Sequence, residues 1–65
     1  MNTINYEKMI KSSGSNLIWK HDKTGAFYLS DGLHLYIWND NLCDWDDSDY
    51  TIRDSIFGEM TIHDK

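Results

Sequence analysis

The feature of the sequence that most constrains the fold is the dipeptide Asp31-Gly32, which separates two apolar and aromatic runs within residues 25–38. An Asp-Gly pair between two β-prone runs predicts a hairpin with a two-residue type I′ turn, because both central residues of that turn need a positive φ. The hairpin then closes at Ser30 and Leu33, and this closure predicts the register of the two strands.

A second hairpin is predicted just before the first one. Residues 17–22 favour a strand, and Asp22-Lys23-Thr24-Gly25 suits a type I turn with a glycine bulge that pairs His21 with Phe27. Together the two hairpins predict a three-stranded antiparallel meander.

Strict alternation sorts the side chains of this meander onto two faces. One face is predicted to hold Leu17, Trp19, His21, Phe27, Leu29, His34, Tyr36 and Trp38. The other is predicted to hold Ile18, Lys20, Asp22, Ala26, Tyr28, Ser30, Leu33, Leu35 and Ile37. Because both faces are largely apolar, each needs a cover from the rest of the chain, or from a partner molecule in the case of the aromatic face.

A short N-terminal helix is predicted to supply one of these covers. Thr3 suits the N-cap, and Tyr6, Met9 and Ile10 form one apolar stripe at helical spacing. Gly14 can adopt the left-handed conformation that ends helices.

A second helix is predicted over residues 49–59, because apolar residues there cover about half of a helical wheel. The alternative is a pair of strands over residues 50–54 and 59–63 that turns at Phe57-Gly58, favoured by the β-branched residues in this part of the chain. The predicted fold class is therefore α+β, a three-stranded antiparallel meander with a short N-terminal and a C-terminal helix. The alternative reading implies a small five-stranded β-barrel.

Length and composition predict one small domain over residues 1–65. The only cysteine, Cys43, cannot form a disulfide within the chain, which favours a reducing compartment. No run is long enough to span a bilayer and no signal pattern opens the sequence. We therefore expect a soluble, cytoplasmic protein, in the host cytoplasm if the protein is viral.

The net charge of −5 is concentrated in one segment. Residues 40–54 contain six aspartates and one arginine. Such a segment repels nucleic-acid phosphate and anionic membranes, and it attracts cations or basic protein surfaces.

The aspartates match a calcium loop poorly. With Asp44, Asp46 and Ser48 at the first three ligand positions, Asp49 stands where the loop needs glycine and Ser55 where it needs glutamate. No metal site is predicted from this segment.

No other residue set predicts catalysis or a cofactor. The three histidines lack metal-ligand spacing, and Cys43 lies beside the carboxylate of Asp44, which disfavours an activated thiolate. A chain of this length also has little material for a concave site that excludes water. We therefore expect no enzymatic activity, no metal and no cofactor.

What remains is recognition through a surface. A line of carboxylates can imitate the charge of nucleic acid and occupy the basic groove of a nucleic-acid-binding protein. The hypothesis is a small acidic protein-binding module, an inhibitor or decoy of the general character of virus-encoded anti-defence proteins. The predicted partner-binding residues are Asp40, Asp44, Trp45, Asp46, Asp47, Asp49, Tyr50 and Asp54.

The alternative hypothesis is a structural or assembly module. A chain with two apolar sheet faces and a small core could homo-oligomerise by burying the aromatic face against a copy of itself, as a homodimer for example. Direct nucleic-acid binding is opposed by the net charge, and no membrane partner is predicted.

Overall fold

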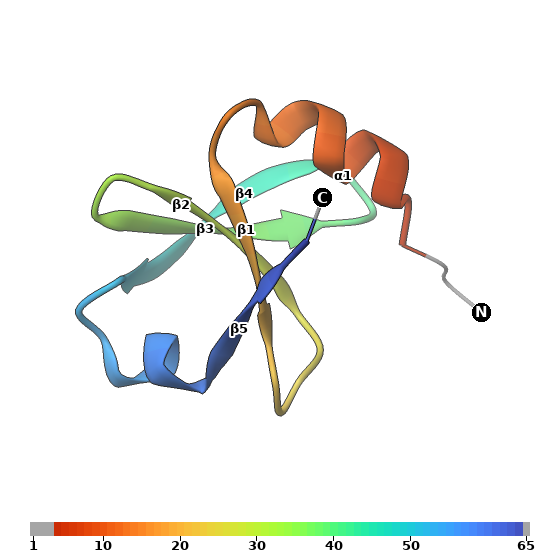
Figure 1. The fold of residues 1–65 in the computed structure, drawn as a ribbon. Coiled ribbons are helices and arrows are strands. Elements are labelled where there is room, and N and C mark those ends of the chain that lie inside the picture. Colours follow the sequence, from red (N-terminus) through yellow and green to blue (C-terminus); the bar gives the residue numbers. More distant parts are fainter. Residues whose placement is uncertain (1–3, 65) are drawn as a thin grey trace.

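The computed structural model describes residues 4–64, which form one α-helix, five β-strands and one 3-10 helix (Figure 1). In chain order the elements are α1 (Tyr6–Ser13), β1 (Leu17–His21), β2 (Phe27–Asp31), β3 (His34–Asn39), β4 (Asp44–Thr51), η1 (Ser55–Glu59) and β5 (Met60–His63). The strands make one antiparallel sheet in the order β4-β3-β2-β1-β5. Four strands follow one another as a meander, and β5 returns to pair with β1. The edges of the sheet are therefore β4 and β5.

The predicted fold class of three strands with two helices is wrong, because residues 44–51 form a strand and residues 49–59 do not form an α-helix. The alternative had the correct number of strands, but its strand over residues 50–54 is replaced by the end of β4 and a turn. Aspartate has a low β-propensity, yet an edge strand lets carboxylates stay in water while its backbone pairs with a neighbour. Pairing with β3 therefore outweighs the local preference for a loop.

The turn between β2 and β3 lies one residue later than predicted. Gly32-Leu33 occupies the two central positions, and Asp31 pairs with His34. Gly32 has a φ of 61° while Leu33 does not have a positive φ, which defines a type II′ turn and not type I′. Ser30 consequently faces Leu35, two residues from the partner predicted for it. A shift of two residues leaves the two faces of this hairpin unchanged.

The pairing between β1 and β2 also differs from the predicted register, by one residue. This difference places each side chain of β1 on the face opposite to the predicted one. The backbone N–H of His21 donates to the carbonyl of Ala26 at 2.8 Å, so that His21 does not pair with Phe27. When the register shifts by an odd number of residues, every side chain of the strand moves to the opposite face of the sheet. Ile18 therefore lies on the same face as Phe27, and Trp19 lies on the opposite face, contrary to the predicted assignment.

Helix α1 begins and ends with side-chain and glycine caps. Asn5 is the N-cap, and its side-chain oxygen accepts a hydrogen bond from the backbone N–H of Lys8 at 3.1 Å. The N-cap predicted at Thr3 lies outside the described residues. Gly14 ends the helix as predicted and has a positive φ of 59°, but its ψ of −128° lies outside the left-handed helical conformation that was expected.

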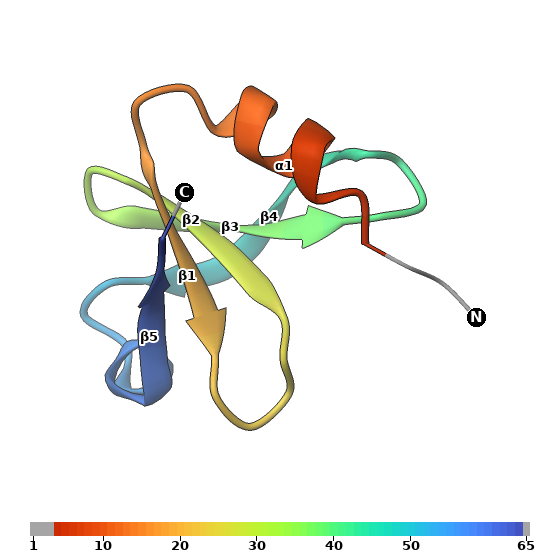
Figure 2. The ribbon, with the colours of Figure 1, turned by 45° about the vertical axis from the view of Figure 1, so that its right-hand side comes forward.

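Elements of the chain itself cover both faces of the sheet. Helix α1 lies across one face (Figure 2), where the buried cluster consists of Met9, Ile18, Phe27 and Trp38. On the other face, the ring of Phe57 from η1 packs edge-on against Trp19 with their centroids 4.8 Å apart. The described part of the chain has no helix that is long and apolar enough to cross a membrane.

Candidate functional site

The candidate site is strand β4, the acidic edge of the sheet. Its first half pairs with β3, and the pairs include Trp45 opposite Trp38 and Asp46 opposite Ile37. Alternation places Trp45 and Asp47 on the face covered by α1, and Asp44 and Asp46 on the other face. The carboxylates are thus brought together on one strand but point to both sides of it.

A bulge interrupts the second half of β4. Between the pairs Tyr36–Asp47 and His34–Thr51, β4 contains two more residues than β3. Asp49, within the bulge, has a left-handed φ of 64°, and the Ser48 hydroxyl donates to the carbonyl of Leu35 at 2.5 Å. The bulge leaves the side chains of Asp49 and its neighbour Tyr50 exposed.

Asp47 forms the ion pair of this strand. Its Oδ1 lies 2.6 Å from Nε2 of His34 and also accepts a hydrogen bond from the backbone N–H of Asp49 at 3.2 Å. The hydrogen bond from His34 is the main cause that lowers the pKa of Asp47, and the backbone bond from Asp49 adds to it. Among residues 4–64, His34 is the only basic side chain that pairs with a carboxylate of β4.

Two of the predicted site residues hold the fold together. Asp40 is half-buried, and its Oδ1 accepts hydrogen bonds from the backbone N–H of Asn5 at 3.0 Å and from Nε1 of Trp38 at 3.2 Å. Asp54 accepts a hydrogen bond from the backbone N–H of Thr51 at 2.7 Å and stabilises the turn that follows β4. These carboxylates are already engaged within the chain.

Trp45 also contacts the body of the protein. Its Nε1 donates to the hydroxyl of Ser12 in α1 at 3.0 Å, and its ring packs edge-on against Trp38 with centroids 5.2 Å apart. It packs against the buried cluster as a half-buried residue. The exposed aromatic side chain at this edge is instead Tyr50, with 40% of its surface in solvent.

The remaining carboxylates of β4 differ in their surroundings. Asp46 is half-buried and accepts a hydrogen bond from the side-chain amide of Asn39 at 2.8 Å. Asp44 is exposed and accepts only from the backbone N–H of the next residue among the hydrogen bonds found in residues 4–64. The most accessible charges of the edge are therefore Asp44, Asp47 and Asp49.

His34 is the residue of this site that the sequence interpretation missed. The sequence predicts no strand for the segment that carries Asp47, and the histidines are assessed there only as metal ligands. Once β4 is known to be a strand, the pairing of β3 with β4 brings His34 next to that carboxylate. The ring of Tyr36 packs against His34 with centroids 4.8 Å apart and helps to hold the imidazole in place.

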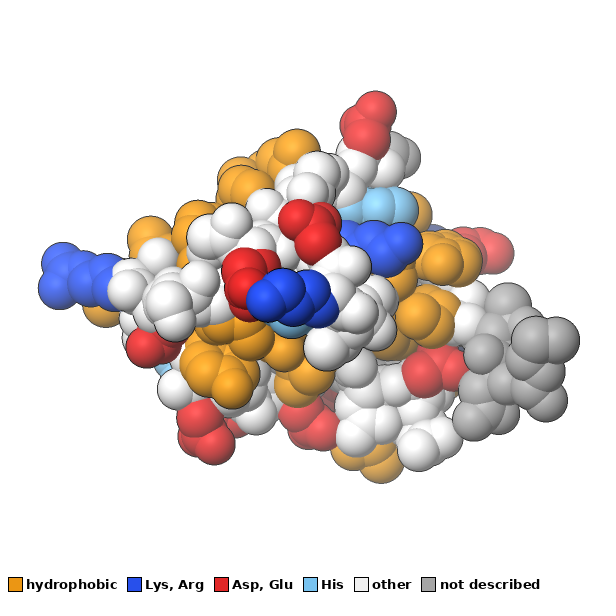
Figure 3. Space-filling model, turned by 90° about the horizontal axis from the view of Figure 1, so that it is seen from below, with side chains coloured by type: hydrophobic (Ala, Val, Ile, Leu, Met, Phe, Trp, Pro, Cys, Tyr) orange, Lys and Arg blue, Asp and Glu red, His pale blue; other side chains and the backbone are white. Residues whose placement is uncertain are grey.

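The side of the molecule opposite α1 has a different character. Figure 3 shows this side from below, with hydrophobic patches interrupted by acidic and basic side chains. The Lys23 ammonium there lies 2.7 Å from Oε2 of Glu59. Lys23 and Glu59 are therefore paired on this side, whereas only one of the four aspartates of β4, Asp47, has a basic partner among residues 4–64.

A second polar cluster links the β1–β2 turn to η1. The imidazole of His21, which is buried, contacts the hydroxyl of Thr24 through Nδ1 at 2.9 Å and Oε1 of Glu59 through Nε2 at 3.3 Å. The hydrogen bond from Lys23 is the largest cause of the lowered pKa of Glu59, and the bond from His21 is the next. This arrangement joins two segments that are far apart in the sequence.

Replacing Lys23 with glutamine should raise the pKa of Glu59 toward the ordinary value for a glutamate, because the main hydrogen-bonding cation is lost. A carboxyl whose folded pKa is lowered adds stability above its ordinary pKa and loses this stability as the pH falls through the folded value. Carboxyl NMR titration measures the shift. Lys20→Gln is the matched control with the same change in charge, and an equal shift in both variants would contradict the assignment.

No group of three or more histidine, cysteine, aspartate or glutamate side chains in residues 4–64 is placed to hold a metal ion. Cys43 is half-buried, and its thiol donates to the carbonyl of Asp40 at 3.4 Å. Comparisons with protein-family models, with curated proteins and with solved structures found no match to this chain. Function is therefore inferred from the geometry of β4.

Proposed function

We propose that this protein binds another protein through β4 and inhibits it by occupying a basic surface that otherwise binds nucleic acid. The observation that carries the proposal is an exposed edge strand with four aspartates and without lysine or arginine. The protein acts by occupation of that surface and does no chemistry of its own.

The spacing of the charges supports this proposal. Residues 44–49 span at most about 17 Å at 3.4 Å per residue, so the three intervals between their four carboxylates average about 6 Å along the strand. Each strand of DNA carries one charge per 3.4 Å of helix axis. The spacing of charges along β4 is thus within about twofold of that along one DNA strand, and a groove of lysine and arginine would bind such a row of charges.

Tyr50 supports a protein partner in particular. Interfaces favour tyrosine as an anchor, and charged residues around such an anchor steer the partner and set the register. Tyr50 is exposed next to Asp49 at the bulge, where a partner can reach both side chains. Trp45 contributes by holding the edge against α1.

The alternative of homo-oligomerisation through the aromatic sheet face gains no support from the fold. Phe27 and Trp38 are buried beneath α1, so a second copy cannot contact them while the helix is in place. We therefore do not propose homo-oligomerisation through this face.

The test compares two double variants that remove the same number of negative charges. Asp44→Asn with Asp49→Asn removes two of the four carboxylate charges of β4, and Glu7→Gln with Asp31→Asn removes two exposed carboxylate charges elsewhere. Each immobilised variant captures basic proteins from a nuclease-treated lysate, followed by salt elution. We expect about tenfold less captured protein with the edge variant and little change with the control. Equal losses would show that only the net charge matters and would contradict the proposal.

A further inference from the structure

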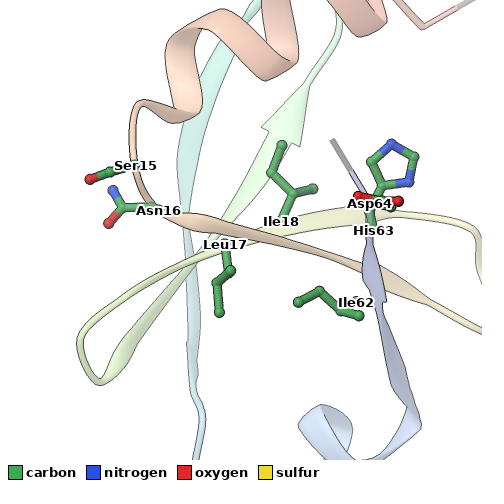
Figure 4. A pocket seen from close by; sticks show the side chains of 7 residues that line it. All are labelled: Ser15, Asn16, Leu17, Ile18, Ile62, His63 and Asp64. Carbon is green, nitrogen blue, oxygen red and sulfur yellow. The ribbon is translucent and has the colours of Figure 1, made fainter.

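A hollow of about 530 Å³ lies at the other end of the sheet, where the beginning of β1 meets the end of β5. Its apolar lining comes from Leu17, Ile18 and Ile62. Figure 4 shows that Leu17 and Ile62 point to the side away from α1, whereas Ile18 and His63 point toward the helix. The hollow is separate from β4, because β4 and β5 are opposite edges of the sheet.

Two large aliphatic side chains remain half in water at this hollow. Leu17 exposes 49% of its surface and Ile62 exposes 51%. Isolated exposed apolar residues are common, but two that line one hollow of this size form a surface that gains from being covered. Removing these two side chains from water would supply the binding free energy of a ligand in this hollow.

The strand register shows what shape of ligand fits. The last pair between β1 and β5 joins Ile18 to His63, while the chain of β1 continues back through Leu17 to Asn16. An extended segment can therefore lie across the exposed side chains of Leu17 and Ile62, next to Asp64. Peptides recognised at sheet edges use backbone pairing for affinity and pockets for alternate side chains.

Charge determines which kind of segment can occupy the hollow. The only carboxylate that lines it is Asp64, and no lysine or arginine does so among residues 4–64. A second copy of this chain would bring another Asp64 and a net charge of −5. The hollow is also open on one side, and small apolar ligands need sites that bury most of their surface.

We propose that this hollow binds an extended segment of another protein in which an aliphatic side chain is flanked by lysine or arginine. The aliphatic side chain packs between Leu17 and Ile62, and a neighbouring basic residue lies against Asp64. This site is independent of the proposed role of β4, and either one can fail without the other.

The experiment is an NMR titration of the ¹⁵N-labelled full chain with two blocked peptides. The first is Lys-Val-Lys-Leu-Lys-Val-Lys, and the second has serine in place of each aliphatic residue and keeps the charge. We expect the first peptide to shift the amide signals of residues 16–18 and 62–64, and the second to leave them in place. Shifts confined to residues 44–51 with both peptides would overturn the site while supporting the role of β4.

Matched variants test the contacts themselves. Leu17→Ser and Ile62→Ser should each weaken binding of the first peptide about tenfold, as expected for an aliphatic side chain that is buried on binding. Leu42→Ser, at a leucine that is 66% exposed and does not line the hollow, should change the affinity less than twofold. Equal affinities for the Leu17 and Leu42 variants would overturn the proposal. A dimer of the free chain that Leu17→Ser dissociates would also overturn it, since a second copy would then be the occupant.

Discussion

Replacing Ile18 with alanine should cost about 2 to 5 kcal/mol of the free energy of unfolding, because its side chain is fully buried in the cluster beneath α1. A chain of this length has about 3 to 10 kcal/mol of stability in total. The variant should therefore lose a large share of its stability and unfold at a clearly lower denaturant concentration. Chemical denaturation followed by tryptophan fluorescence measures the loss.

Ile62→Ala is the matched control for this prediction. It is the same substitution on the strand that pairs with β1, at a side chain that is half-exposed. The control should lose no more than about 1 kcal/mol. Equal losses in the two variants would mean that Ile18 is not in the core, and would restore the reversed face assignment expected from the sequence.

Trp45→Ala should lower the free energy of unfolding by about 2 kcal/mol, because the substitution removes the ring contact with Trp38 and the hydrogen bond to Ser12. The contact between β4 and α1 depends on this side chain. Thermal unfolding followed by circular dichroism measures the effect, and hydrogen exchange of the α1 amides shows whether the helix loosens.

Tyr50→Ala distinguishes a binding residue from a structural one at the same edge. Its side chain is exposed, so the substitution should change stability by about 0.5 kcal/mol or less while reducing partner capture. A large loss of stability in this variant, or none in Trp45→Ala, would contradict the division of roles between the two aromatic residues.

The sequence predicted the existence of both hairpins but could not determine their registers. An Asp-Gly pair is compatible with turns that begin at either residue, and only the pairing of Asp31 with His34 shows that Gly32 comes first. At the turn between β1 and β2, a shift of one residue in the register decides whether the side chain of Ile18 or that of Trp19 faces α1. Both side chains are large and apolar, so the hydrophobic pattern did not distinguish the two registers.

The error over residues 44–59 has a different origin. A strand with aspartate at four of its first six positions lacks the alternation of apolar and polar residues that identifies strands. The apolar residues that follow are divided among the end of β4, a turn, η1 and β5, and their spacing resembles a helical period by coincidence. The sequence therefore identifies acidic candidate site residues without their strand, and His34 lies beside Asp47 only because that strand pairs with β3.

The bulge in β4 has a consequence for how the protein behaves at high concentration. Unpaired strand edges readily add strands from other molecules and so begin aggregates. In β4 the bulge at Ser48 and Asp49 breaks the regular edge, and like charges on two copies would face each other. The opposite edge, β5, is only four residues long. Even in concentrated solution, this sheet should resist growth into fibrils from either side.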